Sequence, residues 1–370
     1  MLEIHGSETI ARLREATEAD HGLVTYDHTK LSAINVCPVW GILRYSLHKR
    51  MPMVGRAMAL EAGQALHEVF AFVRLVSLCD QCDQRGCSRE FIDKVWAYHG
   101  TRLFGYERLQ HIQGVVSEAA DMVDMAKRGA IGVLDTGGFY DDPRDKRRTL
   151  SNMEEAAYAY INRWRWDHPV WMRDLSDPTS DVGIEIPFDV VVDITGKHEL
   201  KFRFTGRIDG IHYDASKRLT IHDNKTASRL GDAWTQAQEI SHQFTGYIVA
   251  ARIFCQDIVE RCDVLGLALP LPRTYDYGGY ARENMVRAPH HVQRWLDWMV
   301  HTILLEREYK DDPIKAPKYT HSCNRFFRPC SFIPLCYSSD DDARKIIEDE
   351  METNVWDPLN KEVLEGVGNE

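Results

Sequence analysis

The spacing of apolar residues predicts helices in the first third of the chain. Apolar side chains recur at steps of three and four over residues 55–78, which is the period of a helix with one buried face. A further helix is expected over residues 29–49, with Pro38 in a first turn or at a kink. Helical spacing continues to about Gly129. The first part of the chain is therefore expected to be mainly helical.

A loop follows the helical part. Residues 132–149 contain the Gly, Asp and Pro residues of a surface loop. Ser151 and Glu154 then form the S-x-x-E pattern of a capping box, in which both side chains bond to backbone N–H groups at a helix start. We expect that helix to run to about Trp166.

The pattern then becomes alternating, which is typical of strands. Residues 182–193, 198–214 and 218–227 alternate apolar with polar residues and are rich in β-branched and aromatic side chains. The polar stretch DASKR joins the last two segments and has the composition of a tight turn. We therefore expect these two segments to form a hairpin.

Helices and one more strand are expected after this hairpin. The apolar spacing predicts helices over residues 235–255 and 288–309, with a strand over residues 263–270 between them. Helices, then a small mixed sheet, then helices again indicate an α/β domain with helical additions.

The hairpin carries two aspartates and a lysine in a pattern that suits metal-assisted phosphodiester hydrolysis. Asp209 lies in one strand, whereas Asp223 and Lys225 are two residues apart and share a face of the next strand. Antiparallel pairing can bring Asp209 beside them, where two carboxylates repel unless a cation lies between them. Oxygen ligands suit Mg²⁺ or Mn²⁺, and a nearby lysine can orient a water molecule or stabilise developing negative charge. A solvated hairpin face with a surface ion pair has the same pattern.

Four other polar residues extend this candidate site. His67 follows Gly63 by four residues in a predicted helix, where its imidazole can be a third metal ligand. Gln243 and Tyr247 lie four residues apart on one helix face and can contact a phosphate or a sugar. Glu185 begins its strand and can serve a second metal or a water molecule, but a carboxylate at a strand edge is expected to be exposed.

Cysteines near both ends of the chain form a second candidate metal site. The segment HSCNRFFRPCSFIPLC contains Cys323, Cys330 and Cys336. Structural zinc sites and cubane iron–sulfur clusters take four protein ligands, and Cys37 is the candidate fourth thiolate. The spacing alone leaves zinc and an iron–sulfur cluster open. Three more thiols are expected in a hydrophilic loop without a metal: Cys79, Cys82 and Cys87.

Charge and composition limit the classes of partner. The net charge of −11 argues against a protein that coats nucleic acid through bulk charge. Residues 339–370, however, contain eleven Asp or Glu and three Lys or Arg, so this tail carries −8 and the rest of the chain carries −3. A near-neutral body can still carry a local basic channel. Without an apolar leader or eighteen consecutive apolar residues, we expect a cytoplasmic protein with reduced cysteines and no membrane span.

The order of these motifs resembles one nuclease family. The stretches GQALH, GRID, DNKT and QFTGY are similar to the G-x-x-x-H, G-x-I-D, D-x-K-T and Q-x-x-x-Y motifs of the RecB-type branch of the PD-(D/E)XK nuclease superfamily. A Cys-Pro near the N-terminus with a C-terminal cysteine triplet is similar to the iron–sulfur subset of that branch, which includes AddB-type, CRISPR-associated RecB-like and phage nucleases. The resemblance spans about residues 30–337. The C-x₆-C-x₅-C triplet is wider than in several members, and Asp223 stands where the superfamily commonly has Glu.

This resemblance implies a fold and roles for the candidate residues. The fold is a restriction-endonuclease-like α/β core with a small mixed sheet, helical embellishments and a C-terminal iron–sulfur cluster loop over residues 1–338, followed by an acidic tail over residues 339–370. The implied ligands of Mg²⁺ or Mn²⁺ are His67, Asp209 and Asp223, with Lys225 as the catalytic lysine and Gln243 and Tyr247 as support on the DNA side. The implied ligands of a structural [4Fe–4S] cluster, preferred here to zinc, are Cys37, Cys323, Cys330 and Cys336.

The implied activity is hydrolysis of DNA, exonucleolytic and directed to single strands or ends. The sequence contains no G-x-x-x-x-G-K-[ST] motif, so unwinding requires a helicase or recombination partner. The alternative is a non-catalytic DNA-binding or scaffold protein of the same fold, stapled by zinc or an iron–sulfur cluster. Loss of the Asp-x-Lys residues would favour that alternative, but Asp223 and Lys225 are both present.

Overall fold

The computed structural model of the chain describes residues 1–358 except 53–57, 165–167, 228, 270–278 and 326–327. The chain divides into two compact units, each built from separate segments. Unit 1 contains residues 1–56, 188–206 and 288–370, and unit 2 contains residues 57–187 and 207–287. Strands β5 (Ile184–Gly196) and β6 (Leu200–Tyr213) run through both units. The candidate catalytic residues therefore all belong to unit 2, and the four proposed cluster cysteines all belong to unit 1.

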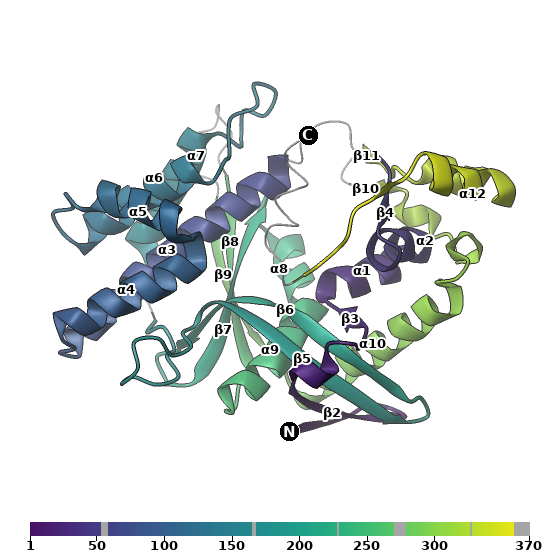
Figure 1. Cartoon of the computed structure of the whole chain (residues 1–370), viewed down its shortest axis with the longest axis horizontal. Coiled ribbons are helices and arrows are strands. Elements are labelled where there is room, and N and C mark those ends of the chain that lie inside the picture. The colour runs from purple at the N-terminus through teal and green to yellow at the C-terminus, as the bar shows by residue number, and fades with distance from the viewer. Residues whose placement is uncertain (53–57, 165–167, 228, 270–278, 326–327, 359–370) are drawn as a thin grey trace. The chain divides into compact units, whose positions relative to one another are not determined.

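Unit 1 combines segments from both ends of the chain with parts of β5 and β6 (Figure 1). Strand β2 pairs with β5 in an antiparallel register from Thr9↔Gly196 to Glu15↔Val190, and β3 pairs with β6 in parallel. The N-terminal hairpin β1–β2 was not predicted, because its short strands lie among many charged residues. The other elements of unit 1 are β1 (Leu2–His5), β2 (Thr9–Glu15), β3 (Thr25–Tyr26), α1 (His28–Val36), α2 (Pro38–Gly41), β4 (Lys49–Arg50), α10 (Pro289–Tyr309), β10 (Asn324–Arg325), β11 (Arg328–Pro329), α11 (Ile333–Tyr337), α12 (Asp340–Asp349) and β12 (Glu352–Thr353).

The start and end of helix α1 have local causes. The Asp27 carboxylate accepts hydrogen bonds from backbone N–H groups of the first turn, which have no partner inside a helix. Pro38 begins α2. The backbone of Cys37 before it is extended, because the proline ring clashes with a helical conformation of the preceding residue. The helix expected over residues 29–49 is therefore two short α-helices followed by a π-helical turn at Ile42–Ser46.

Unit 2 contains the other half of a mixed sheet and most of the helices. The predicted hairpin is confirmed: β6 and β7 pair in an antiparallel register from Tyr213↔Leu219 to Gly210↔His222. Strand β7 pairs in parallel with β8, and β8 pairs in antiparallel with β9. Together with the strands of unit 1 the sheet has eight strands in the order β1-β2-β5-β6-β7-β8-β9 with β3 on β6, so the expectation of a small sheet is wrong. The other elements of unit 2 are α3 (Met58–Gln84), α4 (Arg89–Phe104), α5 (Tyr106–Val116), α6 (Met122–Thr136), α7 (Leu150–Trp164), β7 (Leu219–Ala227), α8 (Asp232–Glu239), α9 (His242–Cys255), β8 (Arg261–Ala268) and β9 (Tyr280–Val286).

Helix α3 is the central helix of unit 2. Figure 1 shows α3 grouped with α4 to α7, and the buried side chains of these helices form one core. By length and hydropathy alone, α3 resembles a membrane span. Of its most apolar window, however, 78% is buried inside the structure, which is the burial of a core helix. Because α3 carries His67, the core of unit 2 fixes the position of that imidazole.

The helix expected over residues 235–255 is interrupted. It consists of α8 and α9, which are separated by Ile240 and Ser241. The Arg287 guanidinium donates hydrogen bonds to the carbonyl oxygens of Gln238 and Ser241, at 3.2 and 3.3 Å. These bonds satisfy carbonyl groups at the break, so a tertiary contact overrides the helical sequence pattern.

The acidic tail is partly ordered. Ser339 caps α12 by accepting a hydrogen bond from the N–H of Asp342, and the aspartates of the first turn favour the positive end of the helix dipole. Ala343 and Met351 are buried in unit 1, and the Trp356 indole N–H donates to Asp27 at 3.2 Å. The tail is therefore more structured than a solvated end, up to the last described residue; residues 359–370 lie outside the described part.

Helix α7 begins differently from the expected capping box, and this correction can be tested. The helix starts at Leu150, so Ser151 lies inside it, and Thr149 Oγ1 accepts a hydrogen bond from the N–H of Asn152 at 3.2 Å. We expect Thr149→Ala to lower the free energy of unfolding by about 1 kcal/mol in urea titrations. The exposed control Ser151→Ala should change it by less than about 0.5 kcal/mol. The reverse order of effects would restore Ser151 as the cap.

Candidate active site

The β6–β7 hairpin brings Asp209, Asp223 and Lys225 together in unit 2. Beyond the last backbone pair of the two strands, the N–H of Asn224 donates to Asp209 Oδ2 at 2.8 Å. A carboxylate thus takes the place of a backbone acceptor at the point where the regular pairing stops. On the neighbouring strand, Lys225 Nζ lies 2.8 Å from Asp223 Oδ2. The two carboxylates and the lysine are therefore neighbours, as the spacing predicted.

Asp223 is the most deeply buried of these groups, with 1% of its surface exposed. Apart from the ammonium group of Lys225, no donor among the described residues bonds to its carboxylate. Burial raises the pKa of Asp223 to about 6, against the lowering effect of Lys225. Burial lowers the pKa of Lys225, but Asp223 and Asp209 raise it by more, so the lysine is a cation at neutral pH. A buried carboxylate with unused lone pairs is a group that a metal cation can satisfy.

His67 lies on the other carboxylate. Its Nδ1 atom is 3.2 Å from Asp209 Oδ2. Burial lowers the pKa of His67, but the charge of Asp209 outweighs it and raises this pKa to about 9. Burial also raises the pKa of Asp209, but the charge of His67 and its hydrogen bond hold it well below its usual range. At neutral pH the two side chains therefore form an ion pair, and a metal ion that binds His67 must displace its proton.

Glu185 joins His67 and Asp209, which corrects the expectation of an exposed strand edge. One ligand atom from each of these three residues lies within 4.8 Å of the other two. The side chain is half-buried, and its charge contributes to the raised pKa of His67. His67, Glu185 and Asp209 thus form one group with metal-ligand spacing, with Asp223 on the adjacent strand.

The backbone of Glu185 has an unusual conformation. Its φ of +47° lies in the left-handed region, which costs roughly 1–2 kcal/mol for a residue other than glycine. Arg102 from α4 donates to the carbonyl oxygens of Ile184 at 2.7 Å and Glu185 at 3.0 Å, and these bonds hold the strained position. Strain of this kind concentrates at functional sites. The alternating sequence of this strand predicted an ordinary conformation and gave no signal for it.

A buried arginine supports the same strands from helix α3. Arg74 lies two turns after His67 and donates to the carbonyl oxygens of Gly183 and Ile211, at 3.2 and 3.4 Å. Its guanidinium lies against Gly210, where an added Cβ would come within 2.5 Å of Cζ. The glycine that follows Asp209 therefore leaves room for this cation, a function that the sequence pattern did not reveal.

Gln243 and Tyr247 face each other at the start of α9. The Gln243 amide donates to Tyr247 Oη at 2.9 Å, as their spacing of four residues predicted. Between them in sequence, the Phe244 ring lies 5.6 Å from Lys225 Nζ. This contact places the first turn of α9 beside the lysine, so both polar side chains belong to an element that adjoins the hairpin.

The four proposed cluster cysteines gather in unit 1. Cys37, Cys330 and Cys336 belong to one hydrophobic cluster, and the N–H of Cys330 donates to the carbonyl oxygen of Cys323 at 2.7 Å. Burial, followed by the nearby Cys37 thiol, raises the pKa of Cys336 to about 11, with smaller contributions from Cys330 and Cys323. These thiols are therefore electrostatic neighbours. The hydrophilic loop expected for Cys79 and Cys82 is wrong, since both are buried in α3.

A mixed α/β fold with carboxylates, an imidazole and a lysine at two adjacent strands has the arrangement of a metal-dependent nuclease. The family model described as the PD-(D/E)XK nuclease superfamily matches residues 28–337. The chain therefore belongs to the PD-(D/E)XK nuclease superfamily. No curated protein matches the chain. Members of this superfamily are generally phosphodiesterase nucleases that act on DNA and use Mg²⁺ or Mn²⁺.

The position of Glu185 predicts a role in cation binding. Glu185→Gln keeps the volume of the side chain but removes its charge, so we expect Mn²⁺ affinity to fall at least about tenfold in an electron paramagnetic resonance titration. The control is Glu155→Gln, an exposed change on α7 that should leave the affinity unaltered. Equal affinities in the two variants would remove Glu185 from the site.

Proposed function

We propose that the chain is a Mg²⁺- or Mn²⁺-dependent deoxyribonuclease that acts as an exonuclease on single strands or DNA ends. The observation that carries this proposal is the convergence of His67, Glu185 and Asp209 beside the buried Asp223–Lys225 pair. Membership of the nuclease superfamily supports the reaction class. The preference for ends and single strands rests on the resemblance to RecB-type nucleases.

The residues present fit a divalent cation. His67, Asp209 and Asp223 are the proposed ligands, and Glu185 adds a third carboxylate within reach of the first two. Three carboxylates and one imidazole suit Mg²⁺ and, because of the nitrogen ligand, suit Mn²⁺ at least as well. The unused acceptor atoms of the buried Asp223 carboxylate support this assignment, because an ion satisfies them without a further protein donor.

Each remaining residue has a task that its position allows. A bound divalent ion supplies Lewis-acid polarisation of the phosphate and a more acidic water molecule. Lys225, held as an ammonium by its carboxylate neighbours, orients the attacking water and stabilises the negative charge that develops on phosphate oxygens. Gln243 and Tyr247, in the first two turns of α9, hold the phosphate or sugar of the strand. Arg102 and Arg74 position the strands that carry the carboxylates.

We also propose that Cys37, Cys323, Cys330 and Cys336 hold a structural [4Fe–4S] cluster. Burial and the neighbouring thiols of Cys37, Cys330 and Cys323 all raise the pKa of Cys336, which is the electrostatic signature of thiols that lie near one another. The preference for a cluster over zinc rests on the resemblance to the iron–sulfur subset, in which each thiolate binds a different iron. The cluster would join residues about 300 positions apart and so stabilise unit 1.

The second candidate function is a non-catalytic DNA-binding or scaffold protein of the same fold. The intact set of Asp209, Asp223 and Lys225 argues against it, since a protein without catalysis does not require a buried carboxylate next to a second carboxylate and a lysine. Residues 1–370 contain no G-x-x-x-x-G-K-[ST] motif, so these residues do not themselves supply helicase activity for duplex DNA.

Lys225→Ala tests catalysis separately from metal binding. This change removes a cation but no proposed ligand, so cleavage should fall by roughly 10²–10⁴-fold while DNA binding and iron content persist. The control is Lys201→Ala, an exposed lysine in β6. Both variants are purified anaerobically and assayed on labelled single-stranded and duplex DNA with Mg²⁺, Mn²⁺ or chelator. Cleavage by Lys225→Ala at the parent's rate would exclude the hairpin as the active site.

Cys330→Ser tests the cluster. The variant should lose iron and the brown absorbance and then show a lower melting temperature, because a metal ligand contributes to folding free energy. The control is Cys255→Ser, which changes a partly buried thiol in α9 of unit 2. A colourless parent that contains zinc, or a Cys330→Ser variant with full iron content, would overturn this assignment.

A further inference from the structure

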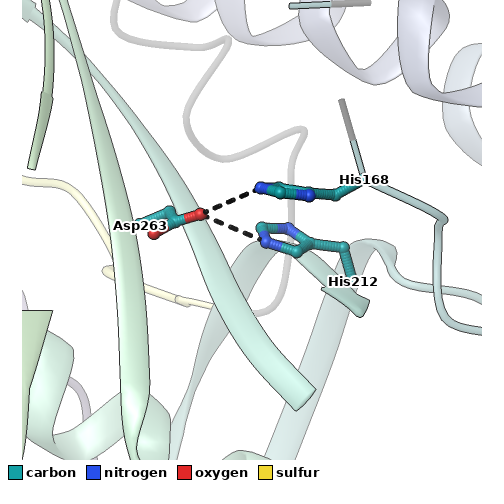
Figure 2. Close-up of side chains that lie close together, drawn as sticks. All are labelled: His168, His212 and Asp263. Atoms are coloured by element: carbon teal, nitrogen blue, oxygen red, sulfur yellow. Dashed lines mark ion pairs between the residues drawn. The ribbon is translucent and has the colours of Figure 1, made fainter. Parts of the chain in front are cut away.

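A second group of metal-ligand side chains lies in unit 2, separate from the proposed catalytic residues. His168, His212 and Asp263 each offer one ligand atom within 4.8 Å of the others. Figure 2 shows both imidazole rings stacked and directed at the same carboxylate. His212 belongs to β6 and Asp263 to β8, the two strands on either side of β7. His168 follows α7 along the chain.

The group lies on the face of the sheet opposite Asp223 and Lys225. In the strand register His222 of β7 pairs with Asp263 of β8 and with Gly210 of β6, and paired residues share a face. His212, two residues beyond Gly210, lies on that face too. Asp223 points to the other face, because successive side chains of a strand alternate. The two groups are therefore different sites in one sheet.

His212 is buried without adequate partners. Its side chain is 1% exposed, and neither ring nitrogen makes a hydrogen bond of good geometry within the described residues. The nearest acceptor, Asp263 Oδ2, lies 3.2 Å from His212 Nε2. Buried polar atoms without partners are rare in folded proteins, so a missing ligand is a physical explanation for this ring.

The distances from Asp263 to the two imidazole rings are close to those of a zinc site. With bonds of 2.0–2.1 Å, two ligands of a tetrahedral Zn²⁺ lie about 3.4 Å apart. Oδ2 of Asp263 is 3.2 Å from Nε2 of His212 and 3.8 Å from Nε2 of His168. The other carboxylate oxygen of Asp263 accepts a hydrogen bond from the Asn284 amide at 2.6 Å. Second hydrogen bonds of this kind orient the carboxylates that bind metals.

The side chains have the protonation forms that bind a metal. Burial lowers the pKa of His212 to about 4, so its imidazole is neutral at pH 7. Burial opposes ionisation of Asp263, but the adjacent His212 ring and the hydrogen bond from Asn284 outweigh this effect and hold its pKa well below the usual range. A neutral imidazole and an ionised carboxylate are the forms that bind Zn²⁺.

A small cavity and a nearby arginine complete the surroundings. His168, His212, His222 and Arg282 line a cavity of about 20 Å³, enough for one water molecule. Arg282 Nη2 lies 3.1 Å from the same Asp263 oxygen that faces the two rings. The guanidinium charge opposes a second cation at this place, so it lowers the affinity of the site for a metal.

We propose that His168, His212 and Asp263 bind one Zn²⁺ ion, with a water molecule from the cavity as the fourth ligand. Two nitrogens and one carboxylate oxygen form a common zinc ligand set with an open fourth position. The ion would join the segment after α7 to β6 and β8, and it would satisfy the buried His212 ring. It would thereby stabilise the sheet on both sides of the catalytic strand.

The test is zinc content in full-length variants. Proteins are loaded with Zn²⁺ in the presence of excess Mg²⁺, which occupies the proposed catalytic site, and are then dialysed against a weak chelator. The parent and His111→Ala, an exposed control in α5, should retain one zinc per chain more than His168→Ala and Asp263→Asn. Equal zinc content in all four proteins would overturn the proposal, and the three side chains would then form an imidazole–carboxylate network without a metal.

Two measurements keep the test independent of variant folding. The parent loaded with Co²⁺ should show the ligand-field spectrum of nitrogen and oxygen ligands, without the charge-transfer bands of thiolate ligands. Added Zn²⁺ should displace the Co²⁺ and remove this spectrum, and absence of the spectrum counts against the site.

Arg282→Gln removes the opposing charge and should lower the dissociation constant for Zn²⁺ at least about tenfold. A simple ion-pair network predicts no such gain, so unchanged or weaker binding in Arg282→Gln would contradict the proposal.

Discussion

Unit 2 is organised around two carboxylates that lie close together in one hairpin and need positively charged or hydrogen-bonding neighbours. An ionised carboxylate loses several kcal/mol of hydration when it is buried, so its neighbours must supply positive charge or hydrogen bonds. Asp209 receives His67 from α3 and the N–H of Asn224, and Asp223 receives Lys225 from its own strand. The helix, the strand pairing and the lysine are therefore coupled to the same electrostatic requirement. A cation-binding site results from this requirement rather than from any single motif.

Strand β7 shows how strictly this arrangement fixes the sheet. His222 and Asn224 bond to each other at 3.0 Å on one face, while Asp223 and Lys225 form their ion pair on the other. All but Lys225 are at most 3% exposed. A slip of one residue against β6 or β8 would turn each polar set to the opposite face and break the bond from the Asn224 N–H to Asp209, although both pairs within β7 would persist. Polar residues on both faces therefore specify the register as firmly as an apolar face does.

Much of the fold and part of the site could be predicted from sequence, because the signals were local. The hairpin, α3, α10 and the neighbourhood of Asp209, Asp223 and Lys225 follow from periodicity and spacing. The break between α8 and α9 depends on Arg287, about 50 residues away. The left-handed Glu185 depends on Arg102, and the His168–His212–Asp263 group draws on three distant segments. Contacts of this range leave no pattern in a single sequence.

The interleaved order of the two units has a consequence for synthesis of the chain. Unit 2 is complete once residue 287 has left the ribosome, whereas unit 1 still lacks α10 and three of its four grouped cysteines. Strand β2 must wait about 180 residues for its partner β5, and Cys37 must wait more than 280 residues for Cys323. Because nascent segments fold as their contacts become available, unit 2 assumes its structure first. The segment around Cys37 is thus made before unit 2 but becomes native after it.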